Sequence, residues 1–273
     1  MNEEQFSRTQ LLIGAEALQR LHRSKVAVFG VGGVGGYVVE ALVRSGVGSL
    51  ELIDNDTVSV SNLNRQIIAT YDTIGRYKTE AASERARSIN PAAAVICRNC
   101  FYLPENAAEF DFASYDYVVD AVDTVTAKLD IIERCVKAGV PVISSMGAGN
   151  KLDPSGFHVM DLSKTKNDPL AKVMRRELRK RGIEHLKVVC SEEQPLMPTA
   201  HMNEESAQSG ENSKAIAAEN SGMIEETAMK TPKNAGIDVK PARRRAVPGS
   251  MAFVPAAAGL VIAGEIVRDL AGL

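Results

Sequence analysis

The sequence carries almost no net charge, and this narrows the classes of function open to it. Its 32 lysine and arginine residues nearly balance 34 aspartate and glutamate residues, giving a formal net charge of -2 and a pI near 6.1. A protein that holds nucleic acid through bulk charge is strongly basic, so that class is excluded, whereas a local basic patch is not. At 273 residues, the chain is long enough for one large α/β domain or a domain with an appendage.

The N-terminus lacks the features of a secretion signal. "MNEEQFSRTQLLIGAEALQRL" has acidic residues where a signal peptide is basic, and an amphipathic pattern where a signal peptide is uniformly apolar. We therefore expect a cytoplasmic protein, with residues 1–24 forming an N-terminal helical arm.

Cysteine is scarce, and its spacing does not suit a metal site. Among four cysteines, only "CRNC" at Cys97 to Cys100 has the spacing of half a zinc site, and no second pair follows. Residues three apart in the strand that we expect here point to opposite faces. We interpret both cysteines as small residues of a strand, and expect reduced thiols and no structural zinc.

Apolar runs of strand length alternate with helical patterns through the first half of the chain. The runs are "KVAVFGV", "SLELIDND", "AVICRNC", "YDYVVDAVD" and "VPVISSMG", separated by segments such as "TAKLDIIERCVKAG". Strands that are apolar throughout are typical of a parallel sheet with helices on both faces. Residues 25–150 are therefore predicted to form a doubly wound, Rossmann-like α/β domain with a mostly parallel sheet.

The pattern changes in the second half. Residues 151–200 are predicted to form a smaller C-terminal α+β extension, in which Asp168 and Pro169 start a helix with one apolar stripe and one basic face. Residues 201–246 are rich in Glu, Ser, Asn and Lys, with almost no aromatic residues. They bury too little apolar surface to offset their ordering entropy, so we predict a mobile polar insertion.

Residues 247–273 are strongly apolar and approach the roughly 20 residues needed to cross a bilayer. Pro248, Pro255 and Glu265 argue against a membrane span. We expect a strand at "SMAFVP" followed by a helix that packs on the sheet or on a dimer partner. Peripheral association with a membrane stays open, but stable insertion is not favoured.

A glycine-rich turn follows the first predicted strand. Gly30, Gly32 and Gly35 form G-x-G-x-x-G at the head of a helix, where free N–H groups and the helix dipole attract phosphate. Gly33 lies in the same turn. Asp54 ends the next strand, at a spacing suited to ribose hydroxyls. This geometry serves NAD or ATP equally.

The residues that follow favour cleavage of a triphosphate over hydride transfer. "NLNRQ" supplies Asn62, Asn64, Arg65 and Gln66, and "GRYK" supplies Lys78. A site that cleaves a triphosphate must stabilise the charge that develops on leaving pyrophosphate, so two converging cations indicate nucleotidyl transfer, whereas a hydride-transfer site gains little from them. Asp123 follows a strand at the edge of the sheet where ligands bind, and a carboxylate there suits Mg²⁺ or the cap of the next helix.

These motifs together resemble the ThiF/MoeB/HesA superfamily, whose members are related to ubiquitin-activating enzymes and adenylate carboxylates. The resemblance runs from "RTQLLIG" through "GVGGVGG", "LIDNDTVSVSNLNRQ", "GRYK" and "DAVDT" to "SSMGAG". It implies ATP on the glycine turn, Asp54 at the ribose, Arg65 and Lys78 at the triphosphate, and Mg²⁺ at Asp123. Further contacts to the nucleotide are implied for Asp56, Asn62 and Gln66. Arg8 matches an arginine that reaches the neighbouring subunit's ATP site, which implies a homodimer and a catalytic role for Arg8.

The segment "DLSKTKNDPLAK" narrows the resemblance to the subgroup of tRNA threonylcarbamoyladenosine dehydratases. That subgroup implies tRNA carrying threonylcarbamoyladenosine as the substrate and ATP-dependent dehydration as the reaction, with sulfur-transfer proteins as candidate partners. Cys190 in "VVCSEE" is a candidate reactive thiol, although ring closure needs no thiol. The basic elements then form a surface for tRNA phosphates: Lys164, Lys166, Lys172, Arg175, Arg176, Arg179 and Lys180.

Three alternatives remain from the sequence. An enzyme that adenylates the C-terminal carboxylate of a ubiquitin-like sulfur carrier would share the nucleotide chemistry. An NAD-dependent oxidoreductase would share the glycine turn and Asp54, but leaves "NLNRQ" and "GRYK" unexplained. A nucleotide sensor or membrane-associated adaptor without catalytic activity has support only from the apolar C-terminus and the polar insertion.

Overall fold

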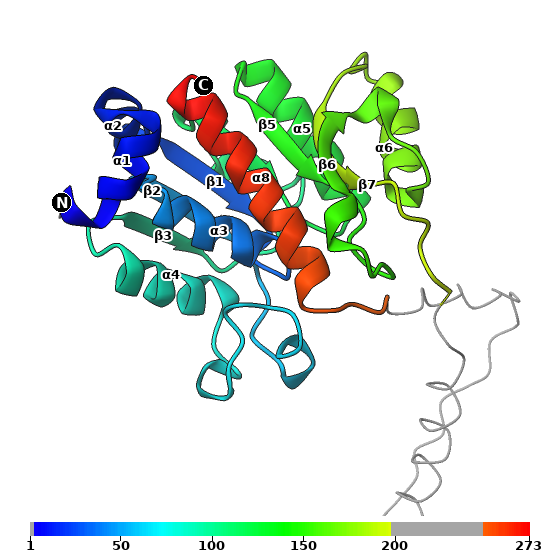
Figure 1. Cartoon of the computed structure of the whole chain (residues 1–273). Coiled ribbons are helices and arrows are strands. Elements are labelled where there is room, and N and C mark those ends of the chain that lie inside the picture. Colours follow the sequence, from blue (N-terminus) through cyan, green and yellow to red (C-terminus); the bar gives the residue numbers. More distant parts are fainter. Residues whose placement is uncertain (1–2, 198–247) are drawn as a thin grey trace, which may run out of the picture. The chain divides into compact units, whose positions relative to one another are not determined.

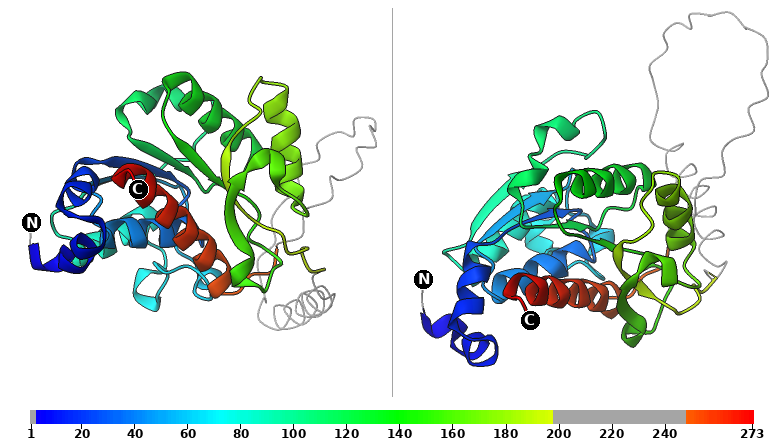
Figure 2. Two further views of the ribbon diagram at one scale, coloured as in Figure 1. Left: turned by 45° about the horizontal axis from the view of Figure 1, so that its top comes forward. Right: turned by 90° about the horizontal axis from the view of Figure 1, so that it is seen from above.

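The fold is a seven-stranded sheet between layers of helices (Figures 1 and 2). The computed structural model describes residues 3–197 and 248–273. The predicted mobile insertion, 201–246, therefore lies outside the described residues. The elements described below belong to one compact unit, Met1–Leu196 with Gly249–Leu273.

The sheet has the order β3-β2-β1-β4-β5-β7-β6. Six strands run parallel to one another: β1 (Lys25–Phe29), β2 (Ser49–Ile53), β3 (Ala94–Arg98), β4 (Tyr117–Asp120), β5 (Val142–Ser145) and β7 (Lys187–Ser191), which pairs with β5. Among the described strands, β6 (Phe157–Asp161) alone is antiparallel, and it pairs with β7. The extension predicted after residue 150 thus adds its strands to the same sheet. The strand order reverses between β1 and β4, which opens a crevice at their carboxyl ends.

Helices cover both faces of the sheet. On one face α3 (Gly35–Arg44) packs over β1, α4 (Lys78–Ile89) over β2 and β3, and α8 (Phe253–Ala271) beside α3 over β5, β6 and β7. On the other lies α5 (Val125–Ala138), and α6 (Pro169–Arg179) packs beside it against β7. Because both faces are covered, Val26 to Phe29 are fully buried, which explains the apolar run. The arm consists of α1 (Ser7–Ile13) and α2 (Ala15–Arg23), which leads into the amino end of β1.

The C-terminal helix, α8, packs against the sheet and lies next to the first turns of α3. A Cβ on Gly259 would lie 2.5 Å from the carbonyl oxygen of Val34, so a larger residue would push α8 away from α3. No helix in the two described ranges is both long and apolar enough to span a bilayer.

Two details of the sequence prediction are wrong. The segment before α8 is not a strand: the helix begins at Phe253, and Pro255 lies in its first turn, where an N–H is not needed for helix hydrogen bonds. The strand at "AVICRNC" is shorter than expected. It ends at Arg98, so Cys97 lies in β3 and Cys100 lies beyond it.

Candidate active site

The glycine turn lies directly after β1 and is fixed by close backbone packing. A Cβ on Gly35 would lie 1.8 Å from the carbonyl oxygen of Gly30, and a Cβ on Gly30 would lie 2.6 Å from that of Ala121, just beyond β4. The turn therefore needs glycine at both positions, and it lies in the crevice between β1 and β4.

Asp54 holds this turn from the end of β2. Its Oδ2 accepts a hydrogen bond from the backbone N–H of Val31 at 2.7 Å, and its Oδ1 accepts one from Asp56 at 2.8 Å. A carboxylate has about four lone-pair sites, so two such bonds leave capacity for ribose hydroxyls. Asp54 therefore lies beside the glycine turn, directly after β2, and it orders that turn.

The "NLNRQ" segment forms a wall beside the turn. Cγ of Arg65 lies 3.7 Å from the position of a Cβ on Gly33, and Nε2 of Gln66 lies 3.9 Å from that of a Cβ on Gly32. Asn62 has another use, since its Oδ1 accepts from Ser59 N at 3.1 Å and closes the local 3₁₀ turn Val60–Asn62. The structure thus brings Arg65 and Gln66 to the glycine turn, whereas the buried side chain of Asn62 stabilises the conformation of the neighbouring 3₁₀ turn.

The side chain of Gln66 shows whether a nucleotide would fit beside the glycine turn. Its Oε1 is buried, and no hydrogen-bond partner for it is found among the described residues. Buried polar atoms are rarely left unpaired, so such an atom beside the glycine turn suits a polar ligand. A nucleotide offers both hydroxyl and amine donors, and the residues present therefore fit ATP.

Lys78 and Asp56 form an ion pair at the start of α4. The Lys78 amine lies 2.6 Å from Oδ2 of Asp56, and the Lys78 N–H donates to the Asp56 carbonyl at 3.0 Å. The lysine side chain is 8% exposed and the aspartate 58% exposed, so solvent reaches the pair from the Asp56 side. The N–H of Asp56 also donates to Asp54, which holds the glycine turn. Lys78 is therefore connected to the glycine turn through Asp56 and Asp54.

Asp123 lies exposed between β4 and α5. The alternative role as a helix cap is wrong, because the N-cap of α5 is Thr124, which makes no side-chain cap bond. Within residues 3–197 and 248–273, the Asp123 carboxylate has no hydrogen-bond or ion-pair partner. It lies two residues beyond Ala121, whose carbonyl oxygen packs closely against Gly30.

Comparison with known protein families and sequences shows which family the chain belongs to. A model described as "ThiF family" matches residues 6–273. The chain belongs to the ThiF family. It is 41% identical over 267 residues to the tRNA threonylcarbamoyladenosine dehydratase of Bacillus subtilis (strain 168), across 97% of this chain and 94% of that protein. It is 42% identical over 176 residues to the Escherichia coli (strain K12) protein of the same name, across 64% of this chain and 66% of that one.

Solved structures give the same result. The crystal structure of the E. coli enzyme, TcdA, in complex with ATP matches with a TM-score of 0.78 at 30% identity, covering 99% of this chain and 95% of that one. Its complex with AMP matches equally well. These comparisons confirm the family resemblance and the α/β fold inferred from the sequence.

A buried network of charged and polar groups, which the sequence analysis missed, lies next to the site at the ends of β4 and β5. Lys128 on α5 places its amine 3.1 Å from Oδ2 of Asp120, and Ser144 Oγ donates to the same oxygen at 2.6 Å. Lys128 also donates to the Ser145 carbonyl at 2.8 Å. The network joins the carboxyl ends of β4 and β5. A lysine on the apolar face of a predicted helix was the available signal for it.

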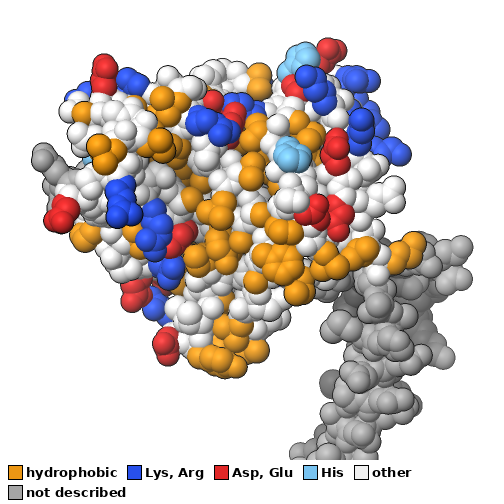
Figure 3. Space-filling model, in the orientation of Figure 1, with side chains coloured by type: hydrophobic (Ala, Val, Ile, Leu, Met, Phe, Trp, Pro, Cys, Tyr) orange, Lys and Arg blue, Asp and Glu red, His pale blue; other side chains and the backbone are white. Residues whose placement is uncertain are grey.

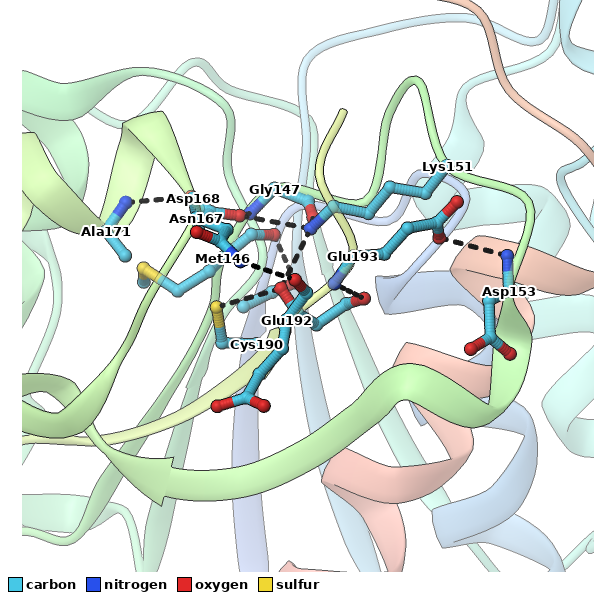
Figure 4. A network of polar contacts seen from close by, with 12 residues as sticks. Met146, Gly147, Lys151, Asp153, Asn167, Asp168, Ala171, Cys190, Glu192 and Glu193 are labelled. Atoms are coloured by element: carbon cyan, nitrogen blue, oxygen red, sulfur yellow. Dashed lines mark hydrogen bonds and ion pairs between the residues drawn. The ribbon is translucent and has the colours of Figure 1, made fainter. Parts of the chain in front are cut away.

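A second buried network fixes the loop after β5 (Figure 4). The Lys151 amine donates to the Gly147 carbonyl at 2.8 Å and lies 3.2 Å from Oδ2 of Asp168. Asp168 in turn accepts from Gly147 N at 3.0 Å and, through Oδ1, from Ala171 N at 2.9 Å, which caps α6. The helix start predicted at Asp168 is confirmed, and the same carboxylate ties α6 to the loop.

Cys190 lies in β7 beside this network and is fully buried. Its Sγ contacts the Ser191 carbonyl at 3.6 Å. Burial, with a smaller contribution from the Asp168 charge, raises the pKa of Cys190 to about 11. A thiol with this pKa is protonated near neutrality and is a weak nucleophile.

The predicted basic surface is largely outward-facing. Figure 3 shows lysine and arginine side chains gathered over α6. A hollow of about 390 Å³ on this helix is lined by Lys172, Arg175, Arg176, Arg179 and Lys180. Arg175 turns inward, since its guanidinium donates to the carbonyls of Leu162 at 3.1 Å and Thr165 at 2.6 Å. Lys164 and Lys166 lie exposed just before the helix.

Arg8 does not reach this site within its own chain. It lies exposed on α1, in the arm that precedes the amino end of β1, whereas the glycine turn follows the carboxyl end of β1. Leu11 and Leu12 of the same helix are 88% and 86% exposed.

Proposed function

We propose that this chain is an ATP-dependent tRNA threonylcarbamoyladenosine dehydratase that works by adenylating the threonyl carboxylate. The placement of Arg65 and Gln66 against the glycine turn, with Asp54 holding that turn, carries the proposal. Hydride transfer gains little from a cation at the phosphates, because no charge develops there, whereas cleavage between the α- and β-phosphates of ATP needs charge stabilised at that place. The named relatives supply the substrate.

The first step makes a leaving group. A carboxylate oxygen of the threonyl group attacks the α-phosphorus of ATP, the bond to the β-phosphate breaks, and pyrophosphate leaves with the electron pair. The product is an acyl adenylate. Arg65 and Lys78 stabilise the growing charge on pyrophosphate, while the backbone N–H groups of the turn hold the nucleotide.

The second step closes a ring. A nitrogen or oxygen of the carbamoyl group attacks the acyl carbon and expels AMP, and one proton is released to solvent. The two reacting groups belong to one nucleoside, so the attack is intramolecular and benefits from high effective concentration. One carboxylate oxygen leaves on AMP, so the nucleoside loses one water overall. No side chain needs to act as a covalent nucleophile.

Asp123 fits a role in holding Mg²⁺. Its carboxylate is exposed and unpaired among the described residues, and Mg²⁺ typically binds one or two carboxylates together with phosphate oxygens and water. When bound, the ion would neutralise charge on the phosphates. The described residues contain no cluster of three or more His, Cys, Asp or Glu side chains suited to a metal, in keeping with a site that ATP itself completes.

The surface of α6 supports a place for the tRNA backbone. Lys172, Arg176, Arg179 and Lys180 face outward, and Asp168 fastens the start of this helix to the loop after β5. Such contacts give affinity that falls with salt and reads little sequence. Arg175 contributes through the hydrogen bonds that shape the surface.

A homodimer completes the site in this proposal. Arg8 is exposed and distant along the fold from the glycine turn, and two almost fully exposed leucines accompany it on α1. Burial of these leucines against a second copy would place Arg8 near the partner's phosphates. Sulfur-transfer proteins remain candidate partners on the basis of the family resemblance alone.

The decisive experiment compares two tRNA preparations, one carrying threonylcarbamoyladenosine and one lacking it. We expect release of AMP and pyrophosphate only with the modified tRNA, and a nucleoside lighter by one water. Arg65→Ala should lower turnover by roughly a hundredfold, on the scale seen when a group that stabilises transition-state charge is removed. Arg76→Ala is the matched control, because Arg76 is a nearby arginine paired with exposed Glu84.

Other outcomes would change the assignment. If neither tRNA releases AMP but a protein with a free Gly-Gly C-terminus supports ATP–pyrophosphate exchange, the substrate is a sulfur carrier's carboxylate. Tight binding of NADH without binding of ATP would favour an NAD-dependent oxidoreductase instead.

A further inference from the structure

Asn64 makes two hydrogen bonds that join Arg65 to a distant part of the chain. Its Oδ1 accepts from Nη1 of Arg65 at 3.0 Å, and its Nδ2 donates to the carbonyl of Ser250 at 3.0 Å. The same Nη1 donates to the Ser61 carbonyl at 2.8 Å. The amide of Asn64 is thus oriented by Ser250 from one side and presents its oxygen to the guanidinium on the other.

Asn150, in the loop after β5, holds the segment that contains Ser250. Its Oδ1 accepts from Gly249 N at 2.6 Å, and its own N–H donates to the Gly249 carbonyl at 2.8 Å. Its carbonyl also accepts from Leu196 N at 2.7 Å. Asn150 has φ of 58°, in the left-handed region that asparagine tolerates better than most residues.

The same segment reaches the glycine turn a few residues later. The Cβ of Pro255, in the first turn of α8, lies 3.2 Å from the position of a Cβ on Gly33, where Arg65 packs from another side. Gly249 to Pro255 therefore connects Asn150, Asn64 and the phosphate turn in one contiguous set of contacts.

We infer that Asn64 and Asn150 are positioning residues that orient Arg65 for the phosphates of ATP. Arginine has a long side chain with high rotamer entropy, so a fixed acceptor on one nitrogen lowers the cost of ordering it when the nucleotide binds. A donor aimed before the reaction is also worth more than one that must reorganise. The inference rests on the proposed function only in requiring that ATP binds this turn.

The first test removes the Asn64 amide in two backgrounds. Asn64→Ala should weaken ATP affinity, measured by calorimetry, and lower kcat for AMP release by roughly tenfold. In an Arg65→Ala background, the same substitution should have almost no further effect, because the residue it positions is gone. A purely structural role would instead lower activity in both backgrounds alike and lower the melting temperature.

The second test exploits the backbone of Asn150. Asn150→Gly keeps the left-handed conformation without strain but removes the acceptor for Gly249, and Asn150→Asp keeps an acceptor at the same place. We expect the glycine variant to reproduce the kcat loss of Asn64→Ala and the aspartate variant to restore most of it. Asn167→Gly is the matched control for ATP affinity: Asn167 also has a left-handed φ, 59°, and its Nδ2 donates to Glu192 O at 3.0 Å.

The outcomes separate this inference from the proposed function. Wild-type protein that binds ATP while Asn64→Ala and Asn150→Gly keep wild-type affinity and kcat would overturn the inference and leave the proposal intact. Additive losses for Asn64→Ala and Arg65→Ala would overturn it too. Wild-type protein that fails to bind ATP would reject the proposed function itself.

Discussion

Cys190 is a residue whose surroundings decide what its thiol can do. It is fully buried in β7, and burial raises its pKa to about 11, so little thiolate exists near neutral pH. We expect Cys190→Ala to lower the free energy of unfolding by about 1 kcal/mol, the scale of a small buried cavity. AMP release per folded molecule should persist, measured by single-turnover assay. Retained ATP–pyrophosphate exchange with loss of AMP release would instead indicate a thioester.

The residues of the site differ in how far sequence alone could identify them. The glycine turn, Asp54 and Arg65 belong to short motifs whose spacing reflects local geometry, and the structure brings them together. Asn150 was not singled out, and the role of Asn64 was not predicted, because the hydrogen bond to Ser250 spans 186 positions. The buried Lys151–Asp168 pair depends on similarly remote contacts that no local pattern encodes.

Among the elements, α8 is joined to the sheet by charges that respond to pH. The Lys187 amine lies 2.8 Å from Oε1 of Glu265 and 2.6 Å from Oδ2 of Asp269. Burial alone would raise the pKa of Glu265, but hydrogen bonds from Lys187 and Arg268 outweigh it, so the pKa lies below its ordinary value of 4.5. Burial alone would lower the pKa of Lys187, but the hydrogen bonds that its amine donates to the carboxylates of Asp269 and Glu265 raise that pKa instead.

The direction of these shifts sets the pH dependence of stability. A carboxyl group with a lowered folded pKa stabilises the fold above its unfolded pKa, and this contribution is lost as pH falls through the folded value. Glu265→Gln should therefore lower the free energy of unfolding by about 1 kcal/mol at pH 7 and have a smaller effect below pH 4. Urea unfolding at both pH values measures this. Glu105→Gln is the control, because Glu105 is exposed and has no ion-pair partner among the described residues. An equal loss at both pH values for Glu265→Gln would contradict the assignment.

The elements themselves follow from the sequence where one physical signal dominates. Buried parallel strands give apolar runs, so the position and length of these runs predict β1, β2, β4 and β5. The segment before α8 was mistaken for a strand because its apolar residues carry no period that separates strand from helix. The addition of β6 and β7 to the same sheet was not predicted either, since pairing partners are set by packing across the whole domain.

At the scale of the whole molecule, the proposed site needs a second copy of the chain. The arm carries Arg8 at the amino side of the sheet, and Leu11 and Leu12 lie almost fully exposed beside it. A symmetric dimer makes every contact twice, so each subunit would lend its arginine to the other. We expect Arg8→Ala to lower AMP release by at least roughly tenfold. Arg23→Ala, an exposed arginine on α2, should leave AMP release unchanged.

Mixing two inactive variants distinguishes a shared site from a site built within one chain. If Arg8→Ala and Arg65→Ala protein exchange subunits freely, half of the dimers are mixed, and each mixed dimer has one site with both arginines intact. About a quarter of the wild-type activity should therefore return on mixing, since one site in four is then complete. Activity that stays at the level of the separate variants, with subunit exchange verified by mass, would place Arg8 outside the partner's site.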